Sequence, residues 1–449
     1  MAQTRDMTTG SPTRHILLFA LPIVAGNLLQ QFYSLVDTVV VGRVEGVTAL
    51  AAVSSSGWLD WMMLSIAMGL AAGFAIQIAQ SFGAHDYAQL RRATGQSVVL
   101  AVLGTVLLEI IAQALLHPAL ILMNTPEETF ALTEIYLRIV FGGLPLIMGH
   151  NLTAGFLRSL GDSRTPLLAM TTSALTNIAL DLLFVAVFRF GVPGVAAATV
   201  IAQGLSCIVC LIAVLRQPLL HPRKEDWRPD GRMIRRLLKL AIPVAMQDCI
   251  ISVGGLVLQT VVNGFGFIFM AGYSAASRLQ GLIEVAGVSL ATGCSTFAGQ
   301  NLGAGQLDRV KAGLRRSAQI GVGMALLVGG VLFLFSPTVL SLFIEDSDPA
   351  TVSQVLGYAV TCLRVNCSAL SALYILFVYR STLQGLGDTL VPMISGFVEL
   401  AMRISAALIL PRLIGEWGVY SAEILAWIGA ACLLVWGYYH RIHLLEKAK

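Results

Sequence analysis

Charged side chains are scarce in this sequence. They make up 12% of its 449 residues, whereas hydrophobic residues make up 56% and the mean hydropathy is +0.78. A soluble domain carries about 25% charged residues. No soluble core could enclose this much apolar surface, so we expect lipid to surround most of the chain. The net charge of +4 does not indicate nucleic-acid binding, because the basic residues lie in short loops rather than in one patch.

Catalytic and nucleotide-binding motifs are also missing. The sequence contains no G-x-x-x-x-G-K-[ST] phosphate loop, no H-E-x-x-H and no G-x-S-x-G. These absences argue against ATP hydrolysis by this chain and against an enzyme, and we expect no cofactor. The seven cysteines all lie in apolar runs, and the Cys207-x-x-Cys210 pair has no histidine or second pair beside it. We interpret them as small helix residues.

Twelve apolar runs are long enough to cross a membrane, which takes about 20 residues. They lack strand alternation, so the predicted fold is an all-α polytopic membrane protein and not a β-barrel. The runs are 15–41, 48–80, 93–116, 130–157, 167–188, 192–215, 237–262, 269–301, 314–343, 353–383, 391–411 and 417–440.

A long polar stretch divides the chain near its middle. Residues 216–236 are predicted to connect an N-terminal lobe, residues 1–215, to a C-terminal lobe, residues 237–449. The basic residues set the orientation. With the N-terminus inside, most of the 29 lysines and arginines fall in inner loops and tails, and the outer loops hold only three arginines. We therefore predict that both termini and the connection are cytoplasmic. The three outer arginines are Arg43, Arg189 and Arg412.

The two lobes resemble each other in sequence. Gly161-Asp162 with Pro166 matches Gly387-Asp388 with Pro392, and similar pairs recur about half a chain apart. Six spans per lobe mean that both lobes enter the membrane from the same side. We predict parallel repeats related by a pseudo-two-fold axis along the membrane normal, which is a transporter architecture. The G-x-x-x-G spacings at 69–73 and 299–303 predict close helix approach.

Ionisable residues inside the spans are candidates for ion coupling, because charges at membrane depth are costly. Asp37 and Asp181 lie at similar depth near the outer ends of their spans, with Asn177 one helical turn from Asp181 and Thr199 entering from the same side. Their oxygens suit Na⁺, and the two carboxylates could carry H⁺ instead. The alternative is that they are polar contacts between helices.

Other intramembrane charges have simpler explanations. Glu399 and Arg403 are spaced i, i+4 on one span, so we expect them to neutralise each other within that helix. Arg138 and Arg364 occupy equivalent repeat positions and are expected to be structural. Asp60, Asp248 and Glu423 remain without an assigned role. Pro22 is a candidate hinge in the first span, because proline removes one backbone hydrogen bond of the helix.

Taken together, these residues resemble the MATE family of multidrug and toxic-compound extrusion transporters. The resemblance rests on Pro22 and Asp37 in the first span, Arg158-x-x-Gly161-Asp162-x-x-x-Pro166, Asn177-x-x-x-Asp181, and residues 194–199. The Asn177 and Asp181 arrangement resembles the DinF-like branch, whereas the acidic C-lobe site of the NorM-like branch has no clear counterpart here.

The resemblance implies a secondary active transporter that exchanges organic, mostly cationic compounds for Na⁺ or H⁺. It assigns the cation site to Asp37, Asn177, Asp181 and Thr199, and it implies a bacterial inner-membrane location. We expect a monomer. The residues that the resemblance places in the substrate cavity are Gln30, Tyr33, Met170 and Gln203.

Two alternatives differ in class. A flippase for a lipid-linked oligosaccharide or a peptidoglycan precursor would have more spans or a strongly cationic cavity. A channel or receptor would not need two lobes with buried acids.

Overall fold

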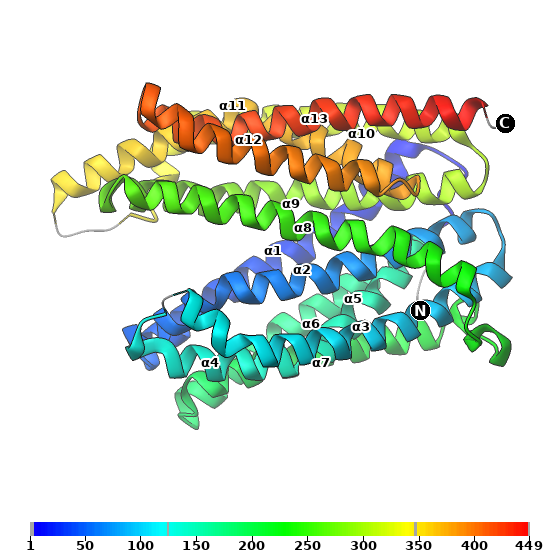
Figure 1. Ribbon diagram of the computed structural model, residues 1–449, viewed down its shortest axis with the longest axis horizontal. Helices are drawn as coiled ribbons and strands as arrows, with labels where there is room; N and C mark the ends of the chain where they lie inside the picture. The colour runs from blue at the N-terminus through cyan, green and yellow to red at the C-terminus, as the bar shows by residue number, and fades with distance from the viewer. Residues whose placement is uncertain (1–3, 124, 345–347, 448–449) are drawn as a thin grey trace. The chain divides into compact units, whose positions relative to one another are not determined.

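The computed structural model describes residues 4–123, 125–344 and 348–447, and these contain helices and no strands. Figure 1 labels the helices. Their bounds are α1 (Pro12–Val44), α2 (Val47–Gly83), α3 (Tyr87–Leu122), α4 (Glu127–Gly142), α5 (Leu144–Ser159), α6 (Arg164–Asp181), the π-helical η1 (Leu182–Val187), α7 (Gly191–Leu215), the 3-10 helices η2 (Pro218–Leu220) and η3 (Lys224–Trp227), α8 (Gly231–Gly264), α9 (Phe267–Gly303), α10 (Leu307–Leu340), α11 (Pro349–Gly385), α12 (Leu390–Ile414) and α13 (Glu416–Lys447).

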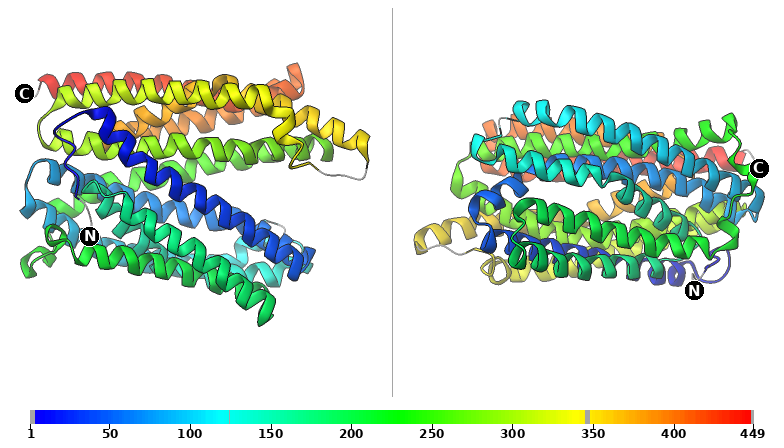
Figure 2. Two further views of the ribbon diagram at one scale, coloured as in Figure 1. Left: turned by 180° about the vertical axis from the view of Figure 1, so that it is seen from behind. Right: turned by 90° about the horizontal axis from the view of Figure 1, so that it is seen from below.

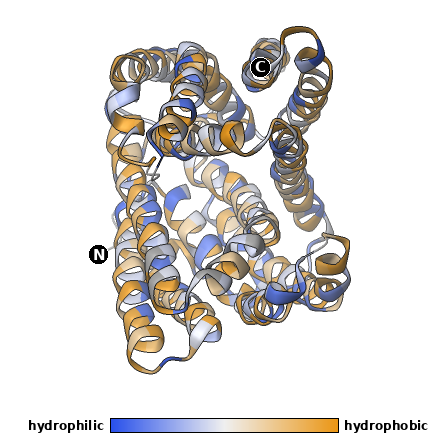
Figure 3. Cartoon of the chain, turned by 90° about the vertical axis from the view of Figure 1, so that its left-hand side faces the viewer, coloured by the Kyte–Doolittle hydropathy of each residue, from blue (hydrophilic) through white to orange (hydrophobic). Residues whose placement is uncertain are grey.

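The predicted spans are confirmed. Among the described residues, 11 helices are long and apolar enough to cross a membrane, and the bent pair α4–α5 makes the count 12. Figure 3 shows the apolar residues that cover these helices. The run predicted at 130–157 is not one straight helix, because α4 and α5 meet at Gly143 with a bend of 45°. Pro145 explains the break, since it lies in the first turn of α5, where a missing N–H costs little.

The chain forms two compact units. Unit 1 comprises residues 1–9, 18–245 and 302–305, and unit 2 comprises residues 10–17, 246–301 and 306–449. Helices within each unit run roughly parallel in two further views (Figure 2). The boundary differs from the predicted connection, because α8 begins at Gly231 and its first half packs within unit 1. Residues 448–449 of the predicted C-terminal tail, and the side chain of Arg43, lie outside the described part of the chain.

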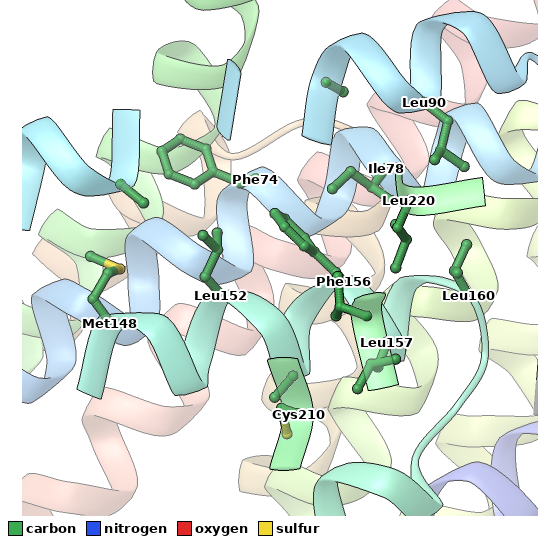
Figure 4. Close-up of a cluster of buried hydrophobic side chains, with 14 of the residues drawn as sticks. Phe74, Ile78, Leu90, Met148, Leu152, Phe156, Leu157, Leu160, Cys210 and Leu220 are labelled. Carbon is green, nitrogen blue, oxygen red and sulfur yellow. The ribbon is translucent and has the colours of Figure 1, made fainter. Parts of the chain in front are cut away.

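Unit 1 has two buried hydrophobic clusters. The connection-end cluster joins α2, α3, α5 and α7 to Leu220 of the polar connection (Figure 4). The far-end cluster joins the last turns of α1 to η1 and the first turns of α7, through Val41, Val185 and Val195. Lipid offers no hydrophobic drive between helices, so such interdigitated contacts hold them together through van der Waals packing.

The predicted repeat is visible in the turns of each unit. Gly161 and Gly387 have φ values of 85° and 76°, a backbone conformation that glycine adopts at little cost. The aspartate after each glycine accepts hydrogen bonds from the backbone of the following helix, from Thr165 to Asp162 at 3.0 Å and from Val391 to Asp388 at 3.3 Å. The same turn chemistry therefore opens α6 and α12.

The G-x-x-x-G spacing in α2 brings two backbones together, as predicted. A Cβ atom on Gly73 would lie 2.2 Å from the Cα atom of Ala241, and one on Gly69 would lie 2.5 Å from that of Ala245. Both contacts join α2 to the first half of α8 within unit 1. Small residues on both helices thus allow an approach that larger side chains would prevent.

We expect Gly73→Ala to destabilise the protein by about 1–3 kcal/mol, because the added methyl group overlaps a backbone rather than a movable side chain. Thermal unfolding of purified protein in detergent measures this. Gly57→Ala is the matched control on the same helix, since a Cβ atom there meets nothing within 4 Å. Equal melting temperatures for the two variants would contradict the close α2–α8 contact.

Candidate ion-coupling site

Three helices of unit 1 carry the predicted cation-site residues. Asp37 lies near the end of α1, Asn177 and Asp181 lie on α6, and Thr199 lies on α7. Helices α6 and α7 pack against each other. Helix α1 approaches α6 closely, since a Cβ atom on Gly26 would lie 2.9 Å from the Met170 sulfur. The sequence and the packing therefore bring these three helices to one place.

The polar groups at the centre of this arrangement are buried and unsatisfied. Asp181 is completely buried, and neither of its carboxylate oxygens has a hydrogen-bond partner in the described part of the chain. Asn177 is 2% exposed, and both its amide nitrogen and its amide oxygen lack partners there. The Oδ1 atom of Asp37 is also buried and has no hydrogen-bond partner among the described residues. A buried polar group without a partner is costly, which makes these side chains a candidate site for a ligand.

Electrostatic interactions tie the aspartates to further residues. The carboxylates of Asp37 and Asp181 lie close enough to repel each other when both are charged. Tyr33 and Tyr136 each lie within electrostatic reach of Asp37, Asp60 and Asp181. Asp60, which the sequence left without a role, therefore belongs to the neighbourhood of the site. Tyr136 was not predicted at all.

Asp181 marks a change in helix type. It is the last residue of α6, and the chain continues directly as the π-helical η1, with the Phe188 N–H donating to the Leu183 carbonyl at 2.9 Å. Single π-helical turns inside a helix occur frequently at functional sites, because the wider turn redirects the side chains beside it. Sequence patterns give no signal for such a turn, and the prediction had one continuous helix here.

The remaining predicted site residues occupy compatible positions. The Thr199 hydroxyl donates a hydrogen bond to the Val195 carbonyl at 3.1 Å. Because its proton is used in this bond, the lone pairs of the hydroxyl oxygen remain for a cation. Tyr33 and Gln30 lie close together on α1, and Tyr33 is one turn before Asp37. Met170 and Gln203 are partly buried on α6 and α7. Pro22 lies inside α1, which is helical on both sides of it.

A sodium ion would need more than carboxylates here. Within the described ranges, no group of three or more His, Cys, Asp or Glu side chains could hold a metal ion. Two aspartates alone supply too few ligands for Na⁺, so the amide oxygen of Asn177 and the hydroxyl of Thr199 would have to contribute. For H⁺ the two aspartates suffice.

The acidic residues of unit 2 have partners, but not those predicted. Glu399 does not pair with Arg403, although the two are one turn apart on α12. Instead Glu399 forms an ion pair of 2.9 Å with Arg380 of α11, and Arg403 forms one of 2.9 Å with Glu423 of α13. The i, i+4 expectation failed because both neighbouring helices offer a partner. Arg380 is buried within α11.

The buried carboxylates of the two units therefore differ in whether they have ion-pair partners. In unit 2, guanidinium groups accompany the carboxylates of Glu399 and Glu423, and Gln280 donates to Glu284 at 2.9 Å. In unit 1, the ion pairs of the described residues include neither Asp37 nor Asp181. Carboxylates without a basic partner inside a membrane protein are candidates for binding and releasing a cation during a transport cycle.

The described residues form up to 12 apolar spans in two helical units, and unit 1 contains buried carboxylates with no ion-pair partner among these residues. These features are those of a polytopic membrane transporter. The MatE family model matches residues 22–183 and 243–409, which is most of the chain. This protein belongs to the MatE family.

Known proteins similar to this chain cover most of its length. It is 29% identical to the "Probable multidrug resistance protein YoeA" of Bacillus subtilis over 97% of this chain and 95% of that protein. It is 30% identical to the "Probable multidrug resistance protein YpnP" of the same organism, over 76% of this chain and 77% of that protein. A crystal structure of a MATE protein in complex with MaL6 matches the fold with a TM-score of 0.92 at 23% identity, covering 98% of this chain and 99% of that one.

Proposed function

We propose that this protein is a secondary active efflux transporter that exchanges organic cations, such as drugs or toxic compounds, for Na⁺ or H⁺. The observation that carries this proposal is the buried carboxylate of Asp181, which has no hydrogen-bond partner among the described residues and lies within electrostatic reach of Asp37. The names of the two Bacillus subtilis relatives support a multidrug substrate range. Since no phosphate loop is present, an ion gradient is the energy source.

The cycle follows from charge neutralisation. A cation that enters from outside binds between Asp37 and Asp181, with Asn177 and Thr199 supplying neutral oxygens. Binding removes the repulsion between the two carboxylates and changes how α1 packs against α6. Helix α1 then bends at Pro22, which lacks one backbone hydrogen bond. The rearranged unit 1 releases the organic cation outward.

Coupling requires that ion and substrate favour different states. A ligand shifts a conformational equilibrium only by its differential affinity for the two states. The ion favours the state in which the aspartates are close together, and the cationic substrate favours the state in which they are charged and accessible. Alternating access then exposes the site to the cytoplasm, where the ion leaves and the next substrate molecule binds.

Dye efflux from vesicles tests the proposal and separates the two ions. Purified protein is reconstituted, and a fluorescent organic cation is followed under an imposed Na⁺ gradient, an imposed H⁺ gradient, or neither. We expect uphill movement of the dye with one of the two gradients and none without a gradient. Movement that follows only the dye's own gradient, with either ion, would refute secondary active transport.

The proposed orientation places both termini and the connection 216–236 in the cytoplasm of a bacterial cell, with the protein in its inner membrane as a monomer. The asymmetry of basic residues supports this orientation. We expect a Lys224→Cys variant to resist an impermeant thiol reagent applied to intact cells and to react after lysis. A variant without the seven natural cysteines is the background for this measurement. Rapid labelling from outside would contradict this orientation and indicate the opposite topology.

A further inference from the structure

A pocket at the connection end of unit 1 brings together arginines from two helices. It has a volume of about 410 Å³ and is lined by Arg92 of α3 and by Arg232 and Arg236 of α8. The other lining residues are Asp86, Ala88, Gln89, Asp230 and Met233. The ion-coupling site lies near the opposite, far-end cluster, and the proposed transport cycle makes no use of this pocket.

The two acidic residues in the pocket are already engaged by the backbone. Asp86 accepts a hydrogen bond from the Gln89 N–H at 2.9 Å and caps α3. Asp230 accepts from the backbone of Met233 and Arg232 at the start of α8 and from Arg92 at 3.2 Å. The Met233 and Arg232 amides and Arg92 keep the pKa of Asp230 below its usual value, so it stays ionised as a cap.

The arginines keep donors for a ligand. Arg232 makes no ion pair in the described residues. Arg236 donates to the side-chain oxygen of Gln80 at 3.2 Å, which orients its guanidinium group and leaves further N–H groups. Arg92 is half exposed. A planar fork of donors that suits two oxygens of one group is the usual arrangement for binding phosphate.

The first turns of α8, which line the pocket, have the residue pattern of a helix end in the lipid headgroup layer. Exposed basic residues cover the first turns of α8, and the first exposed large apolar residue on this helix is Ile242. At 1.5 Å per residue, Arg236 is about 9 Å from Ile242 along the axis, which suits the headgroup layer outside the hydrocarbon core. Tyr87, between two residues that line the pocket, and Trp227 of the connection are exposed, as aromatic residues at membrane interfaces often are.

We propose that the pocket formed by Arg92, Arg232 and Arg236 binds the phosphate of an anionic lipid headgroup from the cytoplasmic leaflet. Basic pockets between membrane helices on the cytoplasmic side favour such headgroups. The lipid would bridge α3 and α8, and would thereby hold the polar connection, which Gln96 anchors through hydrogen bonds of 2.9 Å to the carbonyls of Asp226 and Arg228.

Native mass spectrometry and thermal unfolding test this proposal on the full chain. Protein in nanodiscs of phosphatidylcholine alone is compared with protein in the same lipid containing phosphatidylglycerol. We expect bound phosphatidylglycerol and a higher melting temperature for the natural sequence. Arg232→Ala with Arg236→Ala should lower the affinity roughly 30-fold, from the usual contribution of each basic residue at an anionic surface.

Two controls separate this site from general charge effects. Arg315→Ala with Arg316→Ala removes the same charge from an exposed pair on α10 and should leave the lipid response unchanged. Inorganic phosphate, added to protein in phosphatidylcholine, should not reproduce the stabilisation. An equal loss of lipid binding in both double variants would overturn the proposed site. Stabilisation by inorganic phosphate that matches the lipid effect would overturn the assignment to a lipid.

Discussion

Asp181→Asn is expected to abolish ion-driven efflux while the protein remains in the membrane at normal levels. The substitution keeps the size of the side chain but removes the charge that repels Asp37 and attracts a cation. The buried carboxylate has no hydrogen-bond partner in the described part of the chain, so an amide there breaks no hydrogen bond seen in the structure and folding should be preserved. Efflux from vesicles under the productive ion gradient measures the effect, and size-exclusion chromatography in detergent measures folding.

Asp37→Asn should give the same result, because both carboxylates are needed to hold the ion. Glu109→Gln is the matched control, since Glu109 is a membrane-embedded acid on α3 that does not belong to the site. It should transport at the level of the natural sequence. Full gradient-driven efflux by both aspartate variants would place the coupling site outside unit 1.

Breaking the buried ion pair between Arg380 and Glu399 is expected to cause the largest loss of stability. The side chains are 8% and 4% exposed and lie 2.9 Å apart. Glu399→Leu would leave the buried guanidinium group without its ion-pair partner, and losing one partner of a buried pair typically costs about 3–5 kcal/mol. Denaturant unfolding of the purified protein in detergent would show this as a lower midpoint.

The double variant Arg380→Met with Glu399→Leu provides the control. It removes both charges and replaces them with apolar groups, which often restores stability. We expect most of the lost stability to be recovered and transport to be retained, because each charge of this pair has the other as its partner. A double variant that is as unstable as Glu399→Leu alone would show that the pair is not the reason for the effect.

The fold was predictable from hydropathy because each span is long and the loops between spans are short. Length and apolarity do not report bends, so the 45° break between α4 and α5 was missed. A signal was nevertheless present in the sequence, since Gly142, Gly143 and Pro145 stand together in the middle of that run. Two glycines followed by a proline disfavour a continuous helix.

The features of the candidate site that could be predicted are those that follow from depth in the membrane and from helical periodicity. These rules placed Asp37, Asn177, Asp181 and Thr199 at similar heights, and the structure puts their helices together. They could not show that η1 is π-helical, because no residue type demands that turn. They also could not place Asp60, since its neighbours come from other helices. Tertiary contacts of this kind decide partners among charged residues, as the exchange of partners by Glu399 and Arg403 shows.

The central claim is that ion and substrate movements are linked through the aspartates of unit 1. Linkage is reciprocal, so an outward substrate gradient should drive the coupled ion inward even when no ion gradient is imposed. Ion uptake by proteoliposomes that are preloaded with an organic cation and diluted into buffer without it tests this directly. The account predicts coupled ion movement by the natural sequence and none by Asp181→Asn. Substrate-driven ion movement that persists in Asp181→Asn would contradict it.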